Sequence, residues 1–566
     1  MALTSPNSSL LATLKRWPQG MVYLLTIALA APILIVVAQL FGTSNHWQHL
    51  VDTVLGGYLI NSAILVLGVA IGTLLLGVPT AWLTAMYHFP GRRWLSWALL
   101  LPLAMPAYII AYTYTGLLDY SGPLQSMLRQ LFDWHYGDYT FPDIRTLGGA
   151  IIMLSLVLYP YVYLLARAAF LQQSLTALEA AQTLGLNRRQ SFFRIAVPMA
   201  RPAIIAGMAL ALMETLADYG TVQYFGIDTF TTGIYRTWFG LGDLQAASQL
   251  AAMLLLFVIV LLLLEQWSRR HARYHNSRSS SQRPVKLMIL SRSRQWLLFA
   301  LCLMPLLLGF MIPAIQLGLW SVESYHRVVD EQFWALVANT LKLALITALL
   351  AVVIALSIQL LRRFQPSKGL STAAKVVSFG YAVPGAIIAV AVLTPLGWLD
   401  QQLNRLGTAL FDITPGLLLS GTLFALIFGY LIRFLAVAIN SVESGMGKID
   451  PHIDDAARTL GYPPRTMWYR LHLPLLRGSL LTALLLVFVD VMKELPATLV
   501  LRPFNFNTLA VRTFELAADE RLADSAPSAL MIVAAGLIPV VLLSVAISRS
   551  RSTATQPITT TGEESR

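Results

Sequence analysis

The segment EAAQTLG at residues 179–185 is repeated as DAARTLG at residues 455–461, an offset of 276 residues (179 to 455). At the same offset, RIAVP at 194–198 matches RLHLP at 470–474. Two further matches upstream are Met105-Pro106 with Val383-Pro384 and Asn61-Ser62 with Asn339-Thr340. One structural unit is therefore encoded twice, and the two copies should fold alike.

The composition places this duplicated chain in a membrane. Of its 566 residues, 56% are apolar and only 12% are charged, whereas soluble domains carry about 25% charged residues. Too few polar groups are available to cover the surface of a soluble protein of this size. The single cysteine, Cys302, excludes an intrachain disulfide and a cysteine-based metal cluster.

Twelve stretches have the apolar length, about 20 residues, that crosses a bilayer. They are residues 20–41, 57–86, 94–118, 147–170, 201–225, 246–267, 295–320, 335–361, 372–398, 416–439, 476–500 and 527–548. An even number of spans per copy gives both copies the same orientation, related by a pseudo-two-fold axis along the membrane normal. The predicted fold is an all-α integral membrane protein of about 12 transmembrane helices in two six-helix halves.

This fold divides the chain into five parts. We expect a tail (1–19), a first transmembrane domain (20–267), a basic linker (268–294), a second transmembrane domain (295–548) and a second tail (549–566). Lys and Arg gather in the tails, the linker and one set of loops, and such residues stay on the cytoplasmic side. Both termini are therefore predicted to be cytoplasmic. Topology and contact with the lipid bilayer explain the net charge of +12, so no nucleic-acid partner is expected.

The repeated block falls between the fourth and fifth predicted spans of each half. It is interpreted as a short helix, a glycine turn at Gly185 or Gly461, and a second helix that runs into Pro198 or Pro474. Glycine at these positions is typical of a left-handed helix stop. The paired alanines would leave a small surface against which another protein can pack. A plain connection needs only a few residues, so a loop of this length predicts a docking function.

The pattern E-A-A-x-x-x-G followed by I-x-x-P or L-x-x-P resembles the EAA motif of permease subunits in ATP-binding cassette importers. The matching residues are Glu179, Ala180, Ala181, Gly185 and Pro198, and again Asp455, Ala456, Ala457, Gly461 and Pro474. The resemblance implies the type I importer permease fold, with a coupling helix in each loop that docks on an ATPase. The second copy departs from the motif at Asp455 and at Pro463-Pro464.

The same resemblance implies the partners and the location. It implies two copies of an ATPase subunit that carry ATP and Mg, a periplasmic substrate-binding protein, and the bacterial inner membrane. No G-x-x-x-x-G-K-[ST] phosphate-binding loop occurs in the sequence. We therefore expect a non-catalytic transport subunit with no cofactor of its own.

Two carboxylates lie in or near the fifth span of each half, four in all. Glu214 and Asp218 are four residues apart, which predicts one helix face, and Asp490 and Glu494 repeat the arrangement. Intramembrane carboxylates are candidates for function, and two symmetric pairs predict an anionic constriction for a cation. The alternative is a structural ion-pair network with Lys493, Lys342 and Arg433. No stable metal site is predicted, only transient Fe³⁺ contact at the four carboxylates.

Residues 214–226, 231–239, 490–498 and 501–503 look like fused iron(III)-importer permeases. Ferric ion is a hard cation that prefers oxygen ligands, so Tyr219 joins the four carboxylates as a translocation-pathway candidate. Two alternatives stay open here. One is an ABC importer permease for thiamine, phosphonate or another small solute; the other is a twelve-helix secondary transporter driven by an ion gradient.

Overall fold

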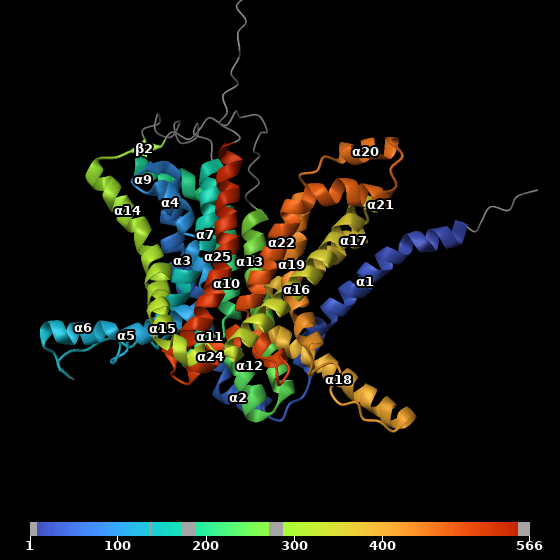
Figure 1. The fold of residues 1–566 in the computed structure, drawn as a ribbon, viewed down its shortest axis with the longest axis horizontal. Helices are drawn as coiled ribbons and strands as arrows, with labels where there is room; N and C mark the ends of the chain where they lie inside the picture. The colour runs from blue at the N-terminus through green and yellow to red at the C-terminus, as the bar shows by residue number, and fades with distance from the viewer. Residues whose placement is uncertain (1–7, 136, 173–186, 271–286, 553–566) are drawn as a thin grey trace, which may run out of the picture.

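The computed structural model describes residues 8–135, 137–172, 187–270 and 287–552, which form an almost entirely helical molecule (Figure 1). Within these residues, eleven helices are long and apolar enough to cross a membrane. A twelfth crossing is formed if residues 92–104 and 107–132, bent by 91° at their junction, count as one broken span. The prediction of a helical protein with about twelve spans is confirmed.

The first half consists of five long helices, one broken span and several short connecting elements. The long helices are α1 (Ser8–Ala38), α3 (Leu55–Met86), α7 (Leu147–Gln172), α10 (Val197–Ala217) and α13 (Leu244–Arg270). The broken span consists of α4 (Arg92–Ala98), η2 (Leu101–Ala104), α5 (Ala107–Leu118) and α6 (Pro123–Phe132). The short elements are η1 (Gln39–Phe41), α2 (Trp47–Thr53), α9 (Arg188–Ser191), the π-turn η3 (Phe192–Ala196), α11 (Gly220–Tyr224), α12 (Phe230–Tyr235) and the π-turn η4 (Arg236–Gly240).

The second half repeats this order. Its spans are α14 (Arg292–Leu306) with the π-turn η5 (Leu307–Met311) and α15 (Ile312–Val328), α16 (Glu331–Phe364), α17 (Lys368–Ser378) with η6 (Phe379–Ala382) and α18 (Gly385–Phe411), α19 (Leu423–Met446), α22 (Leu473–Lys493) and α25 (Leu522–Ser552). The short elements are α20 (Pro451–Thr459), α21 (Pro464–Met467), the π-turn η7 (Trp468–His472), α23 (Pro496–Leu501) and α24 (Leu509–Ala518).

One small sheet modifies the all-helical expectation. Strands β1 (Tyr87–His88) and β2 (Met288–Ile289) pair in parallel, with Tyr87 beside Met288. β2 lies within the predicted linker, and it joins the start of the second half to the first half.

Both halves break their third span at the repeated proline. Pro106 and Pro384 are the N-cap residues of α5 and α18, and the residues before them, Met105 and Val383, are extended with ψ of 110° and 121°. A proline drives the preceding residue out of the helical region. The helix therefore stops and restarts at the same place in each half.

The first span of each half packs on the other half. α1 contacts α17 and α18, and Gln19 Nε2 donates to Gln365 Oε1 at 2.9 Å. In return, α14 contacts α3 and α4, and the Tyr114 hydroxyl of α5 donates to the Leu308 carbonyl of η5 at 2.7 Å. The two halves are thus interlocked rather than placed side by side.

Small residues bring the helices of each core together. A Cβ on Gly207 of α10 would lie 2.7 Å from Val162 Cα of α7, and one on Gly445 of α19 would lie 2.3 Å from Ser479 Oγ of α22. Membrane helices pack closely where small residues let their backbones approach. This close packing fixes α10 and α22, the two helices that lead to the candidate site.

Candidate functional site

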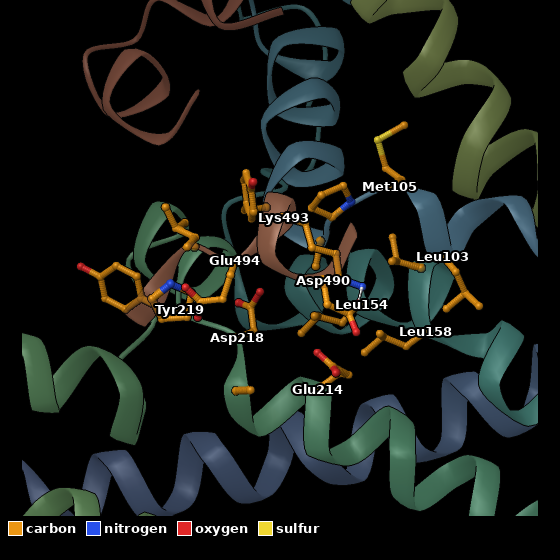
Figure 2. A pocket seen from close by; sticks show the side chains of 18 of the residues that line it. Leu103, Met105, Leu154, Leu158, Glu214, Asp218, Tyr219, Asp490, Lys493 and Glu494 are labelled. Carbon is orange, nitrogen blue, oxygen red and sulfur yellow. Dashed lines mark ion pairs between the residues drawn. The ribbon is translucent and has the colours of Figure 1, made fainter. Parts of the chain in front are cut away.

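A cavity of about 110 Å³ lies between the two halves (Figure 2). Its walls come from α5, α7, α10 and α11 of the first half and from α19, α22 and α23 of the second. It brings together the five predicted pathway residues, Glu214, Asp218, Tyr219, Asp490 and Glu494. In Figure 1 its helix α11 lies toward the end of the molecule opposite α9 and α20.

The carboxylates do not share an uninterrupted helix face, so that detail of the prediction is wrong. α10 ends at Ala217 and α22 ends at Lys493, and the next residues, Asp218 and Glu494, are extended with ψ of 131° and 124°. A new short helix, α11 or α23, follows each one. The fifth span is therefore broken at the site in both halves.

The side chains of Asp218 and Glu494 cap these short helices from the residue just before each N-cap, which is Tyr219 or Leu495. Asp218 Oδ1 accepts from the backbone N–H groups of Thr221 and Val222, at 3.1 and 3.2 Å. Glu494 accepts from those of Ala497 and Thr498, at 3.0 Å each. Such caps satisfy the first free N–H groups of a helix. This pair of carboxylates thus has a structural task.

Glu214 and Asp490 are the two carboxylates whose oxygens stay accessible from the cavity. Their side chains are 27% and 16% exposed, against 2% for that of Glu494. Glu214 Oε1 accepts from the Tyr381 hydroxyl at 3.2 Å, and Asp490 Oδ1 lies 2.8 Å from Lys493 Nζ. These two residues are equivalent in the repeat, so each half contributes one accessible carboxylate to the cavity.

Arg433 of α19 connects the two halves through charge. Its Nη1 donates to Glu494 Oε1 at 2.9 Å, and its Nη2 lies 4.0 Å from Glu214 Oε2. The residue is only 8% exposed. Two of the three basic residues considered as partners, Arg433 and Lys493, therefore form ion pairs here. The third, Lys342, is exposed on α16 and is not part of the cavity wall.

Aromatic residues form the rest of the polar wall. Tyr219 stacks on Tyr235 with ring centroids 4.0 Å apart, and the Tyr235 hydroxyl donates to the Pro496 carbonyl of the other half. Tyr161 and Tyr381 also line the cavity. The sequence reasoning missed both. The position of Tyr381, two residues before the repeated Val383-Pro384, is the feature of the sequence that could have indicated it.

The second repeated loop has the predicted helix and glycine stop. α20 ends in a Schellman motif, in which the Tyr462 N–H donates to the Ala457 carbonyl at 3.1 Å and the Gly461 N–H donates to the Arg458 carbonyl at 3.0 Å. Gly461 has φ of 78°, the left-handed conformation. Glu179, Ala180, Ala181 and Gly185 of the first loop lie outside the described residues.

Only one alanine of the second pair faces outward. Ala456 is exposed, whereas Ala457 is buried. The outer surface of this loop carries Ile453, Leu460 and Tyr462, of which Leu460 is 76% exposed. The loop therefore presents an apolar surface for contact, supplied by larger side chains than the alanines.

A buried acid anchors the loop to the membrane helices. Asp454 Oδ2 accepts from Arg363 Nε of α16 at 2.6 Å, and Asp454 Oδ1 lies 3.0 Å from His472 Nε2 of η7. Asp454 and His472 are both buried.

Pro198 and Pro474 stand near the starts of α10 and α22, directly after the π-turns η3 and η7. Within the described residues, no three His, Cys, Asp or Glu side chains are grouped closely enough to hold a metal ion.

Comparison with protein families gives a match over residues 73–274 to the model described as "Binding-protein-dependent transport system inner membrane component". The chain is 26% identical over 532 residues to the Fe(3+)-transport system permease protein FbpB 2 of Haemophilus influenzae. That match covers 93% of this chain and 97% of the relative.

Two further relatives match over shorter lengths. The ferric transport system permease protein FbpB of Actinobacillus pleuropneumoniae is 24% identical over 425 residues, or 70% of this chain and 58% of the relative. The sulfate transport system permease protein CysT of Salmonella typhimurium is 30% identical over 151 residues, or 26% of this chain and 50% of the relative.

Proposed function

Because the chain belongs to the inner membrane permeases of binding-protein-dependent transport systems, we propose that it forms the translocation pathway for ferric iron in an ATP-driven importer. A permease of this family is the non-catalytic membrane subunit, and an ATPase and a binding protein are its partners. In the proposal, two ATPase copies carrying ATP and Mg dock on the loops at Glu179 and Asp455. A periplasmic binding protein delivers the cargo, and both termini are cytoplasmic.

The charge of the cavity supports a cationic cargo. Its wall holds four carboxylates and only two basic groups, Arg433 and Lys493, which leaves two negative charges unbalanced when all are ionised. Carboxylate and phenolate oxygens suit a hard cation such as Fe³⁺, whereas an oxyanion would meet repulsion here. The relatives named for ferric transport also match this chain over a greater length than the sulfate permease does.

Within this cavity we assign cargo contact to Glu214 and Asp490. The carboxylates of Asp218 and Glu494 accept hydrogen bonds from the N-terminal N–H groups of α11 and α23. Glu214 and Asp490 keep oxygens toward the cavity, and one comes from each half. A pathway must also release what it binds, and two accessible carboxylates hold a cation more weakly than a closed cage of ligands.

The helices α10 and α22 connect the loops to the cavity. α22 begins next to His472, which contacts the loop residue Asp454, and it carries Asp490 near its other end. Its 21 residues span about 31 Å at 1.5 Å per residue. α10 has the same length and carries Glu214. Movement of the loops by an ATPase would therefore shift the two accessible carboxylates directly.

The test is uptake in proteoliposomes that contain the chain, its ATPase and its binding protein. We expect ATP-dependent uptake of ⁵⁵Fe³⁺ supplied as citrate. Glu214→Gln combined with Asp490→Asn should abolish uptake while leaving binding-protein-stimulated ATP hydrolysis in place. Glu515→Gln, which alters the Arg502–Glu515 pair away from the cavity wall, is the matched control.

Two results would overturn the proposal. Normal iron uptake by the double variant would remove the two carboxylates from the pathway. Uptake driven by an ion gradient without ATP would replace the importer with a secondary transporter.

A further inference from the structure

Two helical arms leave the bundle at equivalent places in the two halves. The first arm is α6, and the second arm is residues 396–411 of α18. Each forms the last part of the third span of its half, and each ends at an aspartate in the left-handed conformation, Asp133 or Asp412, with φ of 53° in both. In Figure 1, α6 and α18 project from opposite sides of the bundle, away from the end that carries α9 and α20.

The first arm presents an apolar stripe outward. Leu124, Met127, Leu128 and Leu131 follow the i, i+3, i+4, i+7 spacing of one helix face. Met127 and Leu131 are 55% and 70% exposed. Just beyond the arm, Trp134 stacks on Phe132.

The second arm repeats this arrangement with different residues. Leu399, Leu403, Leu406 and Leu410 lie on one face, and all four are exposed, with Leu410 at 70%. Trp398 stands at the start of this arm and is also exposed. Neither stripe contains an ionisable residue.

The chain after each arm folds back on the opposite, polar face. In the first arm the Tyr139 hydroxyl donates to Gln125 Oε1 at 2.7 Å, and Arg129 Nη1 donates to that hydroxyl at 3.1 Å. In the second arm the Asn404 side chain exchanges two hydrogen bonds with the Gly416 backbone, at 2.8 and 3.0 Å. A fold that covers the polar face and leaves the apolar face outside is built for an apolar environment.

The exposed side of α15, which lies next to the first arm, indicates that this environment is lipid. α5, which leads into the first arm, contacts α15, and a Cβ on Gly116 of α5 would lie 2.5 Å from the Trp320 ring. The outer side of α15 exposes Ile315, Leu319 and Val322 at 59%, 62% and 79%. The apolar surface of a membrane span thus lies next to the arm. Trp is typical of the membrane–water interface, and an amphipathic helix without charge on its apolar face lies in that plane.

We propose that both arms lie in the lipid interface of the membrane face opposite the coupling loops, with their leucine stripes in the acyl region. The two arms anchor the bundle on opposite sides, so each half is held at a fixed depth while its other helices move. The proposal requires only that the chain spans a bilayer, and it does not depend on the cargo.

Site-directed spin labelling of the full chain in phosphatidylethanolamine–phosphatidylglycerol nanodiscs tests it. Cys302→Ser removes the single cysteine, which is fully buried. Leu131→Cys and Leu410→Cys then report the stripes, and Gln130→Cys and Thr408→Cys report the polar sides of the same helices. We expect the ratio of oxygen collisions to nickel-chelate collisions to be several-fold higher at the stripe positions than at their controls.

Two outcomes would overturn the proposal. One is an equal ratio at the stripe and control positions, which would place the stripes in water. The other is shielding of the stripes only after a soluble binding protein is added, which would make the arms a protein-docking surface.

Discussion

The two halves hold their carboxylates with the same backbone but with different charges around them. Asp218 and Glu494 cap equivalent short helices, yet Glu494 is paired with Arg433 and Asp218 has Thr221 as its side-chain partner. Both basic residues of the cavity come from the second half. At the repeat offset of 276 residues, Arg433 and Lys493 correspond to Val157 and Ala217. The two halves therefore share the backbone of the site, whereas its positive charges belong to the second half alone.

The largest effect should come from neutralising the two caps in turn. Glu494→Gln leaves the buried Arg433 without its close partner, and breaking a buried ion pair costs about 3–5 kcal/mol. Asp218→Asn keeps a capping side chain of similar quality and should cost less than about 1 kcal/mol. Thermal unfolding of the purified variants in detergent measures the difference.

The double variant Glu494→Gln/Arg433→Met serves as the control for this comparison. It removes both charges and should recover part of the lost stability. Equal melting temperatures for the two single variants would show that the halves do not differ in the way described.

A methyl group on Gly385 should have an intermediate effect. Its Cβ would lie 2.5 Å from Glu494 Oε1 and 2.7 Å from Arg433 Nη1. The corresponding residue after the proline in the first half is Ala107, where a Cβ is already present. Gly385→Ala should therefore cost about 1–3 kcal/mol by overpacking, and Ala107→Gly less than about 1 kcal/mol. Similar melting temperatures for the two exchanges would contradict the role of the ion pair.

The smallest effect on stability is expected at the glycine of the loop. Gly461→Val forces a branched residue into φ of 78°, which costs about 1–2 kcal/mol. We expect membrane insertion to be unchanged and both transport and ATPase stimulation by the binding protein to fall. Gly461→Asn, which tolerates this conformation better, is the control. Gly185→Val tests whether the first loop is equally sensitive, and unchanged coupling in both valine variants would remove the loops from the coupling path.

The sequence predicts the spans, the duplication and five residues of the cavity wall well, because apolar length and spacing carry that information. It did not reveal the break between Glu214 and Asp218. A signal was present, since Asp218 and Glu494 stand two residues before Gly220 and Pro496, which are helix-start positions after a cap. Four-residue spacing alone favoured an unbroken helix.

Other features depend on tertiary contacts that no local pattern encodes. The sequence names Arg433 as a candidate for a structural ion-pair network. Its pairing with Glu494 depends on the packing of α19 against α22 and α23. The span predicted over residues 372–398 ends too early, since α18 continues to Phe411. The leucine spacing from 399 to 410 was visible in the sequence, and it lay in a region treated as a connection.

The exchange of first helices between the halves has a consequence for how the chain holds together. α1 packs on α17 and α18, and α14 packs on α3 and α4. These contacts hold the two halves together independently of the linker that joins them in the chain. A protein made as two separate polypeptides, divided between α13 and β2, should therefore assemble into the same heterodimer. The linker therefore ensures one copy of each half per complex and contributes little to the association of the halves.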